Sequence, residues 1–302
     1  MKKGLRFLPI VCLMAVLGFN MPSRAQSPQT LEVGPHFGAT SYVGDLNVWR
    51  NLPQWDWKQL NQFHYDLGAV VRFNYDSRWS FRLDYTYLHA RACDTVTAWR
   101  PQSQLNFKTT AHDLSLLVEF NFLDYYTGRN DKSFSPYIFG GLSGLLYWVQ
   151  PFTGDEALDA YYFNDLHGEQ VQGNAHHSAY MADAFTADVQ KGTPNKALSI
   201  PFGLGCKVSI SEHLAATAEW RMHYTFTDWF DGVSGDYSAN NQHATGLDSQ
   251  GDAYDFTDPT GSFPEGYQRG NARNNDWFGM FNLSLTWKFV IPDNAACQLT
   301  DH

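Results

Sequence analysis

Apolar and polar residues alternate along most of the chain, so that within many segments every second residue is hydrophobic. A period of two is typical of a β-strand whose two faces meet different surroundings. The pattern predicts eight strands, at about 31–43, 65–75, 79–87, 113–122, 137–149, 198–209, 214–226 and 277–289. The strand at 137–149 is rich in glycine and apolar on both faces, so its two sides stay unassigned.

The connections between these segments alternate strictly in length. Three are short, at 76–78, 127–132 and 211–213, and the four others, at 44–64, 90–106, 150–197 and 227–276, are long. An antiparallel up-and-down barrel in a membrane has short turns at one end and long loops at the other. We therefore expect an all-β, eight-stranded antiparallel transmembrane barrel with short periplasmic turns and long extracellular loops.

The charges support this interpretation. The apolar faces carry no charged residue, and aromatic residues recur near strand ends, as at the boundaries of a bilayer. The opposite faces carry acids and bases in equal number, which suits paired charges in a lumen that eight strands leave nearly filled. We predict a plugged barrel with a lumen network of Arg72, Arg82, Asp84, Glu119, Lys207, Glu219, Arg221 and Lys288. A soluble lipocalin-like or sandwich protein, with its apolar face inward, shares the alternation and is the alternative.

The first residues indicate export. Lys2, Lys3 and Arg6 precede a short apolar run, and Ser23-Arg24-Ala25 offers small residues for a signal peptidase. This predicts a cleaved signal peptide at 1–25, a barrel at 26–292 with long loops at 150–197 and 227–276, and a periplasmic tail at 293–302. The location predicted is the cell outer membrane. The formal net charge of −10 argues against a nucleic-acid partner, which requires a basic surface.

The cysteines that remain after cleavage are sparse and odd in number: Cys93, Cys206 and Cys297. Cys206 falls on the lipid-facing row. Cys93 and Cys297 are expected at opposite ends of the barrel, so they cannot pair within one chain. Cys297 is either a free thiol or forms an intermolecular disulfide.

The sequence offers little for metal or catalytic chemistry. The long loops are acidic, and solvated side chains explain this better than calcium, for which Asp252, Asp255 and Asp258 are weak candidates. The histidines His167, His176 and His177 lie in one long loop and are improbable zinc ligands. No spacing of acids, histidines and serines points to catalysis. We predict neither an enzyme nor a cofactor.

Four stretches carry a family resemblance: 41–47 (SYVGDLN), 121–128 (NFLDYYTG), 134–141 (FSPYIFGG) and 274–278 (NNDWF). With these the chain resembles the PorG-like outer-membrane proteins of Bacteroidetes, which are associated with type IX protein secretion. The resemblance implies a noncatalytic barrel that anchors periplasmic ring or lipoprotein components of a secretion machine.

Two surfaces would face such partners, the turn at 124–134 and the tail at 291–302. The candidate partner-binding residues are Tyr125, Tyr126, Arg129, Asn130, Lys132, Pro292 and Cys297. Alternatively, both tyrosines belong to the aromatic belt and the rest is a solvated turn. Two other functions are left open, a small-solute pore and surface adhesion through the acidic extracellular loops.

Overall fold

The computed structural model describes residues 29–44, 64–93, 106–150, 194–233, 235–237, 245–247, 253–255, 261–271 and 273–291. The predicted signal peptide and periplasmic tail lie outside these residues, as do Pro292, Cys297, Asp252 and Asp258 and the three loop histidines.

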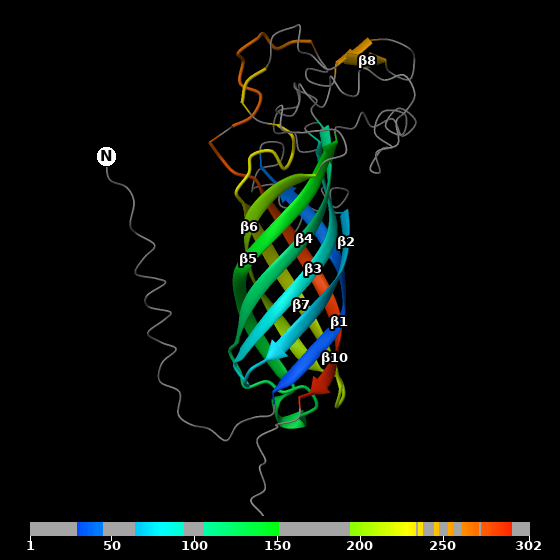
Figure 1. Cartoon of the computed structure of the whole chain (residues 1–302), viewed down its shortest axis with the longest axis vertical. Helices are drawn as coiled ribbons and strands as arrows, with labels where there is room; N and C mark the ends of the chain where they lie inside the picture. Colours follow the sequence, from blue (N-terminus) through cyan, green and yellow to red (C-terminus); the bar gives the residue numbers. More distant parts are fainter. Residues whose placement is uncertain are drawn as a thin grey trace, which may run out of the picture.

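Eight long strands close into one antiparallel barrel (Figure 1). They are β1 (Thr30–Val43), β2 (His64–Asn74), β3 (Trp79–Cys93), β4 (Asn106–Asn121), β5 (Phe134–Gln150), β6 (Asn195–Ser209), β7 (Leu214–Thr225) and β10 (Trp277–Val290). Their order is β1-β10-β7-β6-β5-β4-β3-β2, so each pairs with its neighbour in the chain, and β1 pairs with β10 to close the barrel. The short strands β8 (Thr245–Leu247) and β9 (Ala253–Asp255) form a separate two-stranded sheet. Among the described residues no helix is long and apolar enough to cross a membrane. The predicted all-β, eight-stranded fold is confirmed.

The two ends of the barrel differ as the connection lengths predict. At one end, here the turn end, residues 75–78, 122–133 and 210–213 join β2 to β3, β4 to β5 and β6 to β7. The middle turn includes a single 3-10 turn, η3 (Asn130–Lys132), at the foot of the barrel in Figure 1. The described chain also starts and finishes here, where the Ile291 amide donates a hydrogen bond to the Gln29 carbonyl at 3.1 Å. The strand ends that the longer connections join all lie at the opposite end, here the loop end.

The outer wall is apolar and the interior is polar. Phe37, Leu116 and Leu198 point outward with 60%, 64% and 67% of their surface exposed. Glu32 and Arg72, by contrast, are fully buried inside. A soluble barrel has the reverse arrangement, whereas a barrel in lipid needs an apolar outside and a closed set of backbone hydrogen bonds. The protein is therefore a transmembrane barrel, and the lipocalin-like alternative is wrong.

The sequence did not show which face of β5 points inward. The inner face is apolar because two aromatic side chains of this strand lie in the lumen. Tyr137 and Phe139 point inward and lie over glycines of β6. A Cβ atom added at Gly203 would lie 2.7 Å from Phe139 Cζ, and one at Gly205 would lie 2.9 Å from Tyr137 Cζ. The inner glycines of β6 thus make the room that the rings of β5 fill.

Candidate functional site

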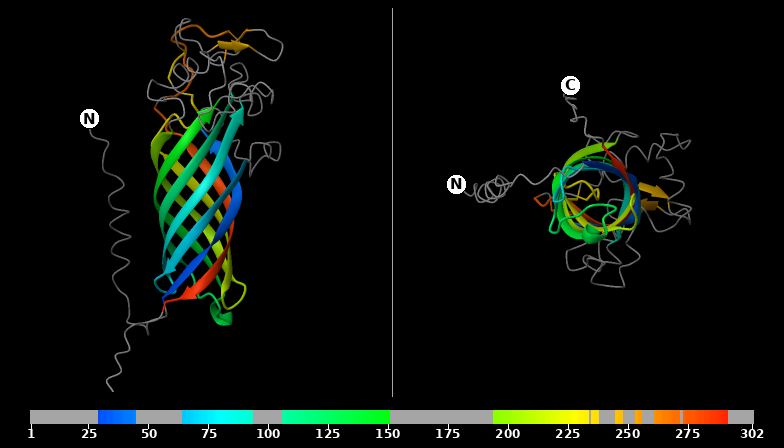
Figure 2. Two further views of the ribbon diagram at one scale, coloured as in Figure 1. Left: turned by 45° about the vertical axis from the view of Figure 1, so that its right-hand side comes forward. Right: turned by 90° about the horizontal axis from the view of Figure 1, so that it is seen from below.

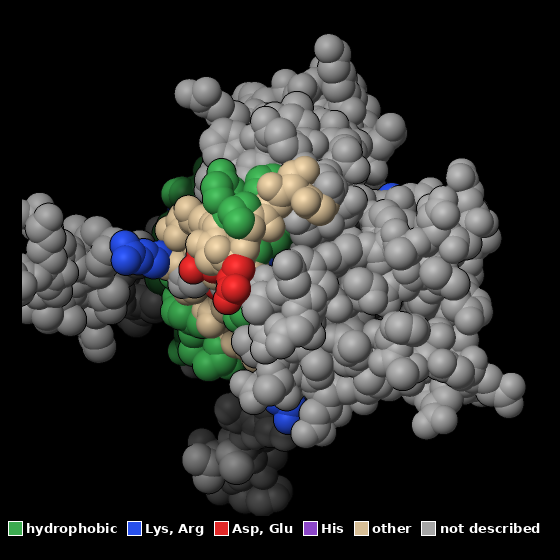
Figure 3. Space-filling view, turned by 90° about the horizontal axis from the view of Figure 1, so that it is seen from above, with side chains coloured by type: hydrophobic (Ala, Val, Ile, Leu, Met, Phe, Trp, Pro, Cys, Tyr) green, Lys and Arg blue, Asp and Glu red, His purple; other side chains and the backbone are tan. Residues whose placement is uncertain are grey.

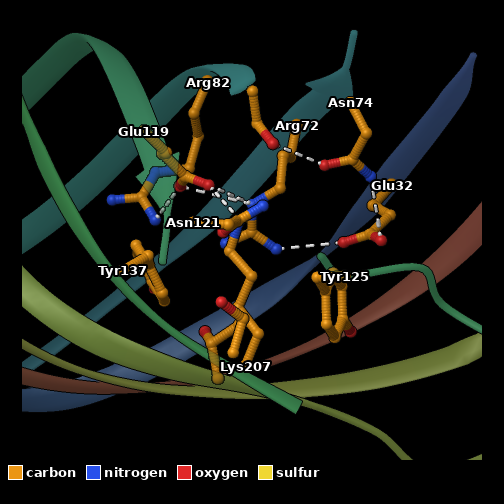
Figure 4. A network of polar contacts seen from close by, with 12 residues as sticks. Glu32, Arg72, Asn74, Arg82, Glu119, Asn121, Tyr125, Tyr137 and Lys207 are labelled. Carbon is orange, nitrogen blue, oxygen red and sulfur yellow. Dashed lines mark hydrogen bonds and ion pairs between the residues drawn. The ribbon is translucent and has the colours of Figure 1, made fainter. Parts of the chain in front are cut away.

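The lumen nearest the turn end is filled by an ion network (Figure 4). Arg72 lies between two carboxylates, with its Nη1 3.0 Å from Glu32 Oε2 and its Nε 3.0 Å from Glu119 Oε2. Lys207 Nζ lies 2.5 Å from the same Glu119 oxygen and 4.5 Å from the centre of the Tyr137 ring. These side chains come from β1, β2, β4, β5 and β6, so the network ties most of the barrel wall together. Charges buried in this way are tolerated because each is paired.

A second layer continues the network toward the middle of the barrel. Arg82 Nη1 lies 2.7 Å from Glu119 Oε1, which links the layers, and it also pairs with Glu219. Arg221 Nη2 bridges Asp84 Oδ2 at 2.5 Å and Glu219 Oε2 at 3.1 Å. With Glu32, Arg72, Glu119 and Lys207, these residues make four acids and four bases, so the cluster is neutral.

Closer to the loop end, two buried histidine–carboxylate pairs lie inside the barrel. His36 Nδ1 is 3.9 Å from Asp66 Oδ1, and His223 Nδ1 is 3.9 Å from Asp113 Oδ1. Thr40 and Asn282 donate to Asp66, as Ser115 and Ser143 do to Asp113. The carboxylates are thus held by hydroxyl and amide donors. Sequence spacing did not reveal either pair, since its members lie on different strands.

The loop end of the lumen is closed by residues that follow β7. Phe230 is fully buried and stacks on Phe278 at 5.1 Å, and Phe278 stacks on His223 at 4.3 Å. The Tyr42 hydroxyl bonds to Asp231 of the same segment and to Asp276 Oδ1 at 2.8 Å. Seen from below in Figure 2, the yellow segment after β7 lies within the outline of the barrel. Seen from above, described acidic and hydrophobic side chains lie side by side at this end (Figure 3). We call residues 228–233 the loop-end plug.

The turn end of the lumen is closed by the β4–β5 turn. Tyr125 is only 4% exposed, and its hydroxyl lies 3.2 Å from Thr127 Oγ1. Thr127 Oγ1 donates in turn to Glu32 Oε1 at 2.6 Å, which attaches the turn to the ion network. Burial raises the pKa of the Tyr125 phenol well above its usual range. Gly128, at φ +90°, lets the chain leave the lumen, and a Cβ atom there would lie 2.5 Å from the Glu212 carbonyl oxygen.

Beyond the lumen, the same turn presents a fixed outer surface. Asp124 accepts hydrogen bonds from Arg78 Nε at 2.6 Å and Lys132 Nζ at 3.2 Å. Slight burial raises the pKa of Asp124, but these two bonds outweigh it and hold the pKa below its usual value. The centre of the Tyr126 ring lies 5.5 Å from Arg129 Cζ and 5.4 Å from Lys132 Nζ, so two cations contact this ring.

The structure brings together seven of the eight residues predicted for the lumen network. Lys288 lies apart, because its Nζ donates to the Thr127 carbonyl at 2.5 Å instead of pairing with a carboxylate. Of the predicted partner-binding residues, Tyr126, Arg129, Asn130 and Lys132 lie on the outer surface of the turn. The prediction for Tyr125 is wrong: the ring faces the lumen, where a partner cannot reach it. It is not a belt residue either.

No metal-binding cluster occurs within the part of the chain that the structure describes. Of the calcium candidates only Asp255 is described, as the last residue of β9. Among the cysteines, Cys206 is described as a half-buried free thiol on β6.

Comparison with protein families places the chain in a family with no assigned function. Residues 9–166, just over half of the chain, match the model described as "Domain of unknown function (DUF6089)". The chain belongs to the DUF6089 family. The matched part includes β1 to β5 and the β4–β5 turn. No curated protein matches the sequence.

Solved structures similar to this DUF6089 protein are outer-membrane proteins of low sequence identity. OprG from Pseudomonas aeruginosa is 9% identical, with 88% of this chain and 98% of OprG covered and a TM-score of 0.38. The N-terminal β-barrel domain of Pseudomonas aeruginosa OprF is 12% identical, with 86% and 97% covered and a TM-score of 0.35. The outer-membrane protease OmpT from Escherichia coli is 7% identical, with 89% and 99% covered and a TM-score of 0.33. TM-scores this low support no conclusion about function.

Proposed function

We propose that this protein is a noncatalytic outer-membrane barrel that passes no solute and anchors a periplasmic protein assembly by its turn end. The observation that carries the proposal is the filled lumen: Phe230 at the loop end, the ion network in the middle, and Tyr125 at the turn end. A barrel whose interior is occupied in this way acts through its ends, not through transport. This argues against the pore.

The outer surface of the β4–β5 turn suits an anchoring role. Arg129 and Asp131 pair with each other at 3.2 Å, and their side chains are 57% and 60% exposed, so the pair is accessible to a partner. The Asp124–Lys132 ion pair braces this turn internally, and the contacts of Asp124 with Arg78 and of Thr127 with Glu32 hold it to the barrel. Because the turn is already ordered, a partner that binds it loses little conformational entropy.

The assembly that we propose is the type IX protein secretion machinery. The support for this assignment is the resemblance of the stretches at 41–47, 121–128, 134–141 and 274–278 to PorG-like proteins of Bacteroidetes. The stretch at 121–128 is part of the proposed contact turn, which connects the resemblance to the anchoring surface.

A tagged protein in its native host tests the proposal. The envelope is crosslinked, the barrel is purified, and the captured proteins are identified for the wild type, for Arg129→Ala with Asn130→Ala, and for the control Glu265→Ala at the loop end. We expect periplasmic proteins with the wild type and the control, and their loss with the turn variant. Capture that is equal in all three, or a barrel that purifies alone, contradicts anchoring. Normal type IX secretion after deletion of the gene contradicts that assignment alone.

A further inference from the structure

Six aromatic rings form a continuous cluster on the outer wall, across four neighbouring strands. The cluster consists of Tyr65 on β2, Tyr85, Tyr87 and His89 on β3, His112 on β4 and Trp148 on β5. Each ring centroid lies within 5.9 Å of another in the set. We call this set the boundary cluster.

The boundary cluster lies where the apolar wall stops. The outward row of β4, continued by Phe122 at the start of the following turn, is apolar from Leu114 to Phe122 and changes to His112, Thr110 and Lys108 toward the loop end. The apolar part extends over about 26 Å at roughly 3.3 Å per residue, or about 20 Å along the barrel axis for strands tilted by ~40°. The apolar band of outer-membrane barrels is about 25 Å tall. His112 lies about 5 Å beyond Leu114 along the axis, at the edge of this band, and Lys108 lies about 15 Å beyond Leu114, at the level of lipid headgroups.

The polar atoms of the cluster are arranged to donate hydrogen bonds. The Tyr85 hydroxyl lies 2.7 Å from His112 Nδ1. When the hydroxyl donates to Nδ1, the ring proton resides on Nε2, which then donates on the other side. Among the described residues, His89 Nε2 and Trp148 Nε1 are buried without a hydrogen-bond partner. Polar atoms in such positions usually find a partner in protein, water or ligand.

The charge of this part of the wall is positive. Lys108 is exposed one step beyond Thr110 on the same outward row. The outward rows of β2, β3, β4 and β5 contain no aspartate or glutamate within their described residues. An ammonium group and an imidazole N–H on one row, beside aromatic faces, suit a phosphate group attached to a sugar.

We propose that the boundary cluster binds the phosphorylated sugar headgroup of an outer-leaflet glycolipid. Lys108 Nζ and His112 Nε2 donate to the phosphate, and the aromatic faces pack against the sugar. The site would hold the barrel to a particular lipid at its loop end. It rests on the transmembrane fold and is independent of any partner at the turn end.

Native mass spectrometry of the full-length barrel in detergent tests this proposal. The probes are lipid A, dephosphorylated lipid A and inorganic phosphate, each added at the same concentration. We expect lipid A to bind the wild type, and Lys108→Gln with His112→Gln to weaken that binding at least about tenfold, since a hydrogen bond to a charged group is lost. Arg273→Gln, which removes one exposed positive charge near β10 on the opposite wall, should change nothing.

Four results overturn the proposal: no binding of lipid A to the wild type, equal binding of dephosphorylated lipid A, equal loss with Arg273→Gln, or competition by inorganic phosphate at the same concentration. The last would identify a site for free anions. The first variant changes side chains on the outer wall and Arg273→Gln changes an exposed residue of the connection before β10, and the mobility shift of folded barrels on unheated gels verifies that each is folded. Failure to bind lipid A leaves the anchoring proposal intact, because that proposal is tested with turn variants.

Discussion

Glu119 is the residue on which the ion network depends most, and its replacement by glutamine gives the sharpest test of the lumen. The Glu119 carboxylate forms ion pairs with three cations: Arg72 at 3.0 Å, Arg82 at 2.7 Å and Lys207 at 2.5 Å. When Glu119 is neutralised, Arg72 still forms an ion pair with Glu32, and Arg82 still forms ion pairs with Asp84 and Glu219. Lys207 has Glu119 as its one ion-pair partner among the described residues, and both side chains are 0% exposed.

Glu119→Gln therefore leaves Lys207 as a buried charge without a carboxylate, close to the rings of Tyr137 and Tyr125. Removing one partner of a buried pair costs about 3–5 kcal/mol. Lys207→Met should lower the free energy of unfolding much less, by about 1–2 kcal/mol. Glu119 keeps its ion pairs with both arginines, and the methionine side chain fills a similar volume. The double variant should recover part of the loss, since the buried ammonium is no longer present.

The assay is urea unfolding of the barrel folded in phospholipid vesicles, followed by tryptophan fluorescence. Glu212→Gln, at an exposed carboxylate in the β6–β7 turn, is the matched control and should lie within about 0.5 kcal/mol of the wild type. The reasoning is refuted if Glu119→Gln is no more harmful than Glu212→Gln, or if Lys207→Met destabilises the barrel as much as Glu119→Gln does.

Three further predictions concern the wall, the loop-end plug and the turn. Gly203→Val should prevent folding, because its Cβ would lie 2.2 Å from the Trp220 carbonyl oxygen, whereas Gly144→Val has nothing within 4 Å and should fold as judged by unheated gels. Tyr42→Phe removes the hydroxyl that binds Asp231 and Asp276, so it should cost about 1–3 kcal/mol and speed amide exchange in residues 228–233; unchanged exchange would contradict that role for Tyr42. Because the pKa of Asp124 is lowered, the stability that its ionised carboxylate gives to the turn is fully present above the ordinary aspartate pKa. That stability is lost as the pH falls through the lowered value. The protection factors of amides in residues 124–132, which correct for the intrinsic pH dependence of exchange, should therefore fall in acid for the wild type and be low at every pH for Asp124→Asn; equal profiles of protection against pH would refute this.

The barrel was predictable because alternation and connection length are local properties. In β6, for example, Leu198, Phe202 and Leu204 alternate with Ser199, Gly203 and Gly205, and the structure exposes the first set to the outside. A short turn next to such a segment indicates an antiparallel neighbour without knowledge of any contact.

The lumen was less predictable because its contacts join strands that are far apart in the chain. Opposite charges on inward rows predict pairing, but not that Arg82 contacts Glu219 across the barrel, 137 positions away. The direction of Tyr125 depends on Gly128 and on the Glu32–Thr127 contact, which composition does not reveal. The loop-end plug was missed for the same reason, although Trp229 and Phe230 between Asp228 and Asp231 were an apolar pair in an acidic loop.

The central claim is that the lumen is closed, so that the protein acts through its ends. Single-channel recording of the pure, folded barrel in planar phospholipid bilayers tests this most directly. We predict no conductance steps at any voltage that the bilayer withstands, because Phe230, the ion network and Tyr125 occupy the lumen in turn. Stable, reproducible open-channel steps from the wild-type protein would contradict the account and favour the pore.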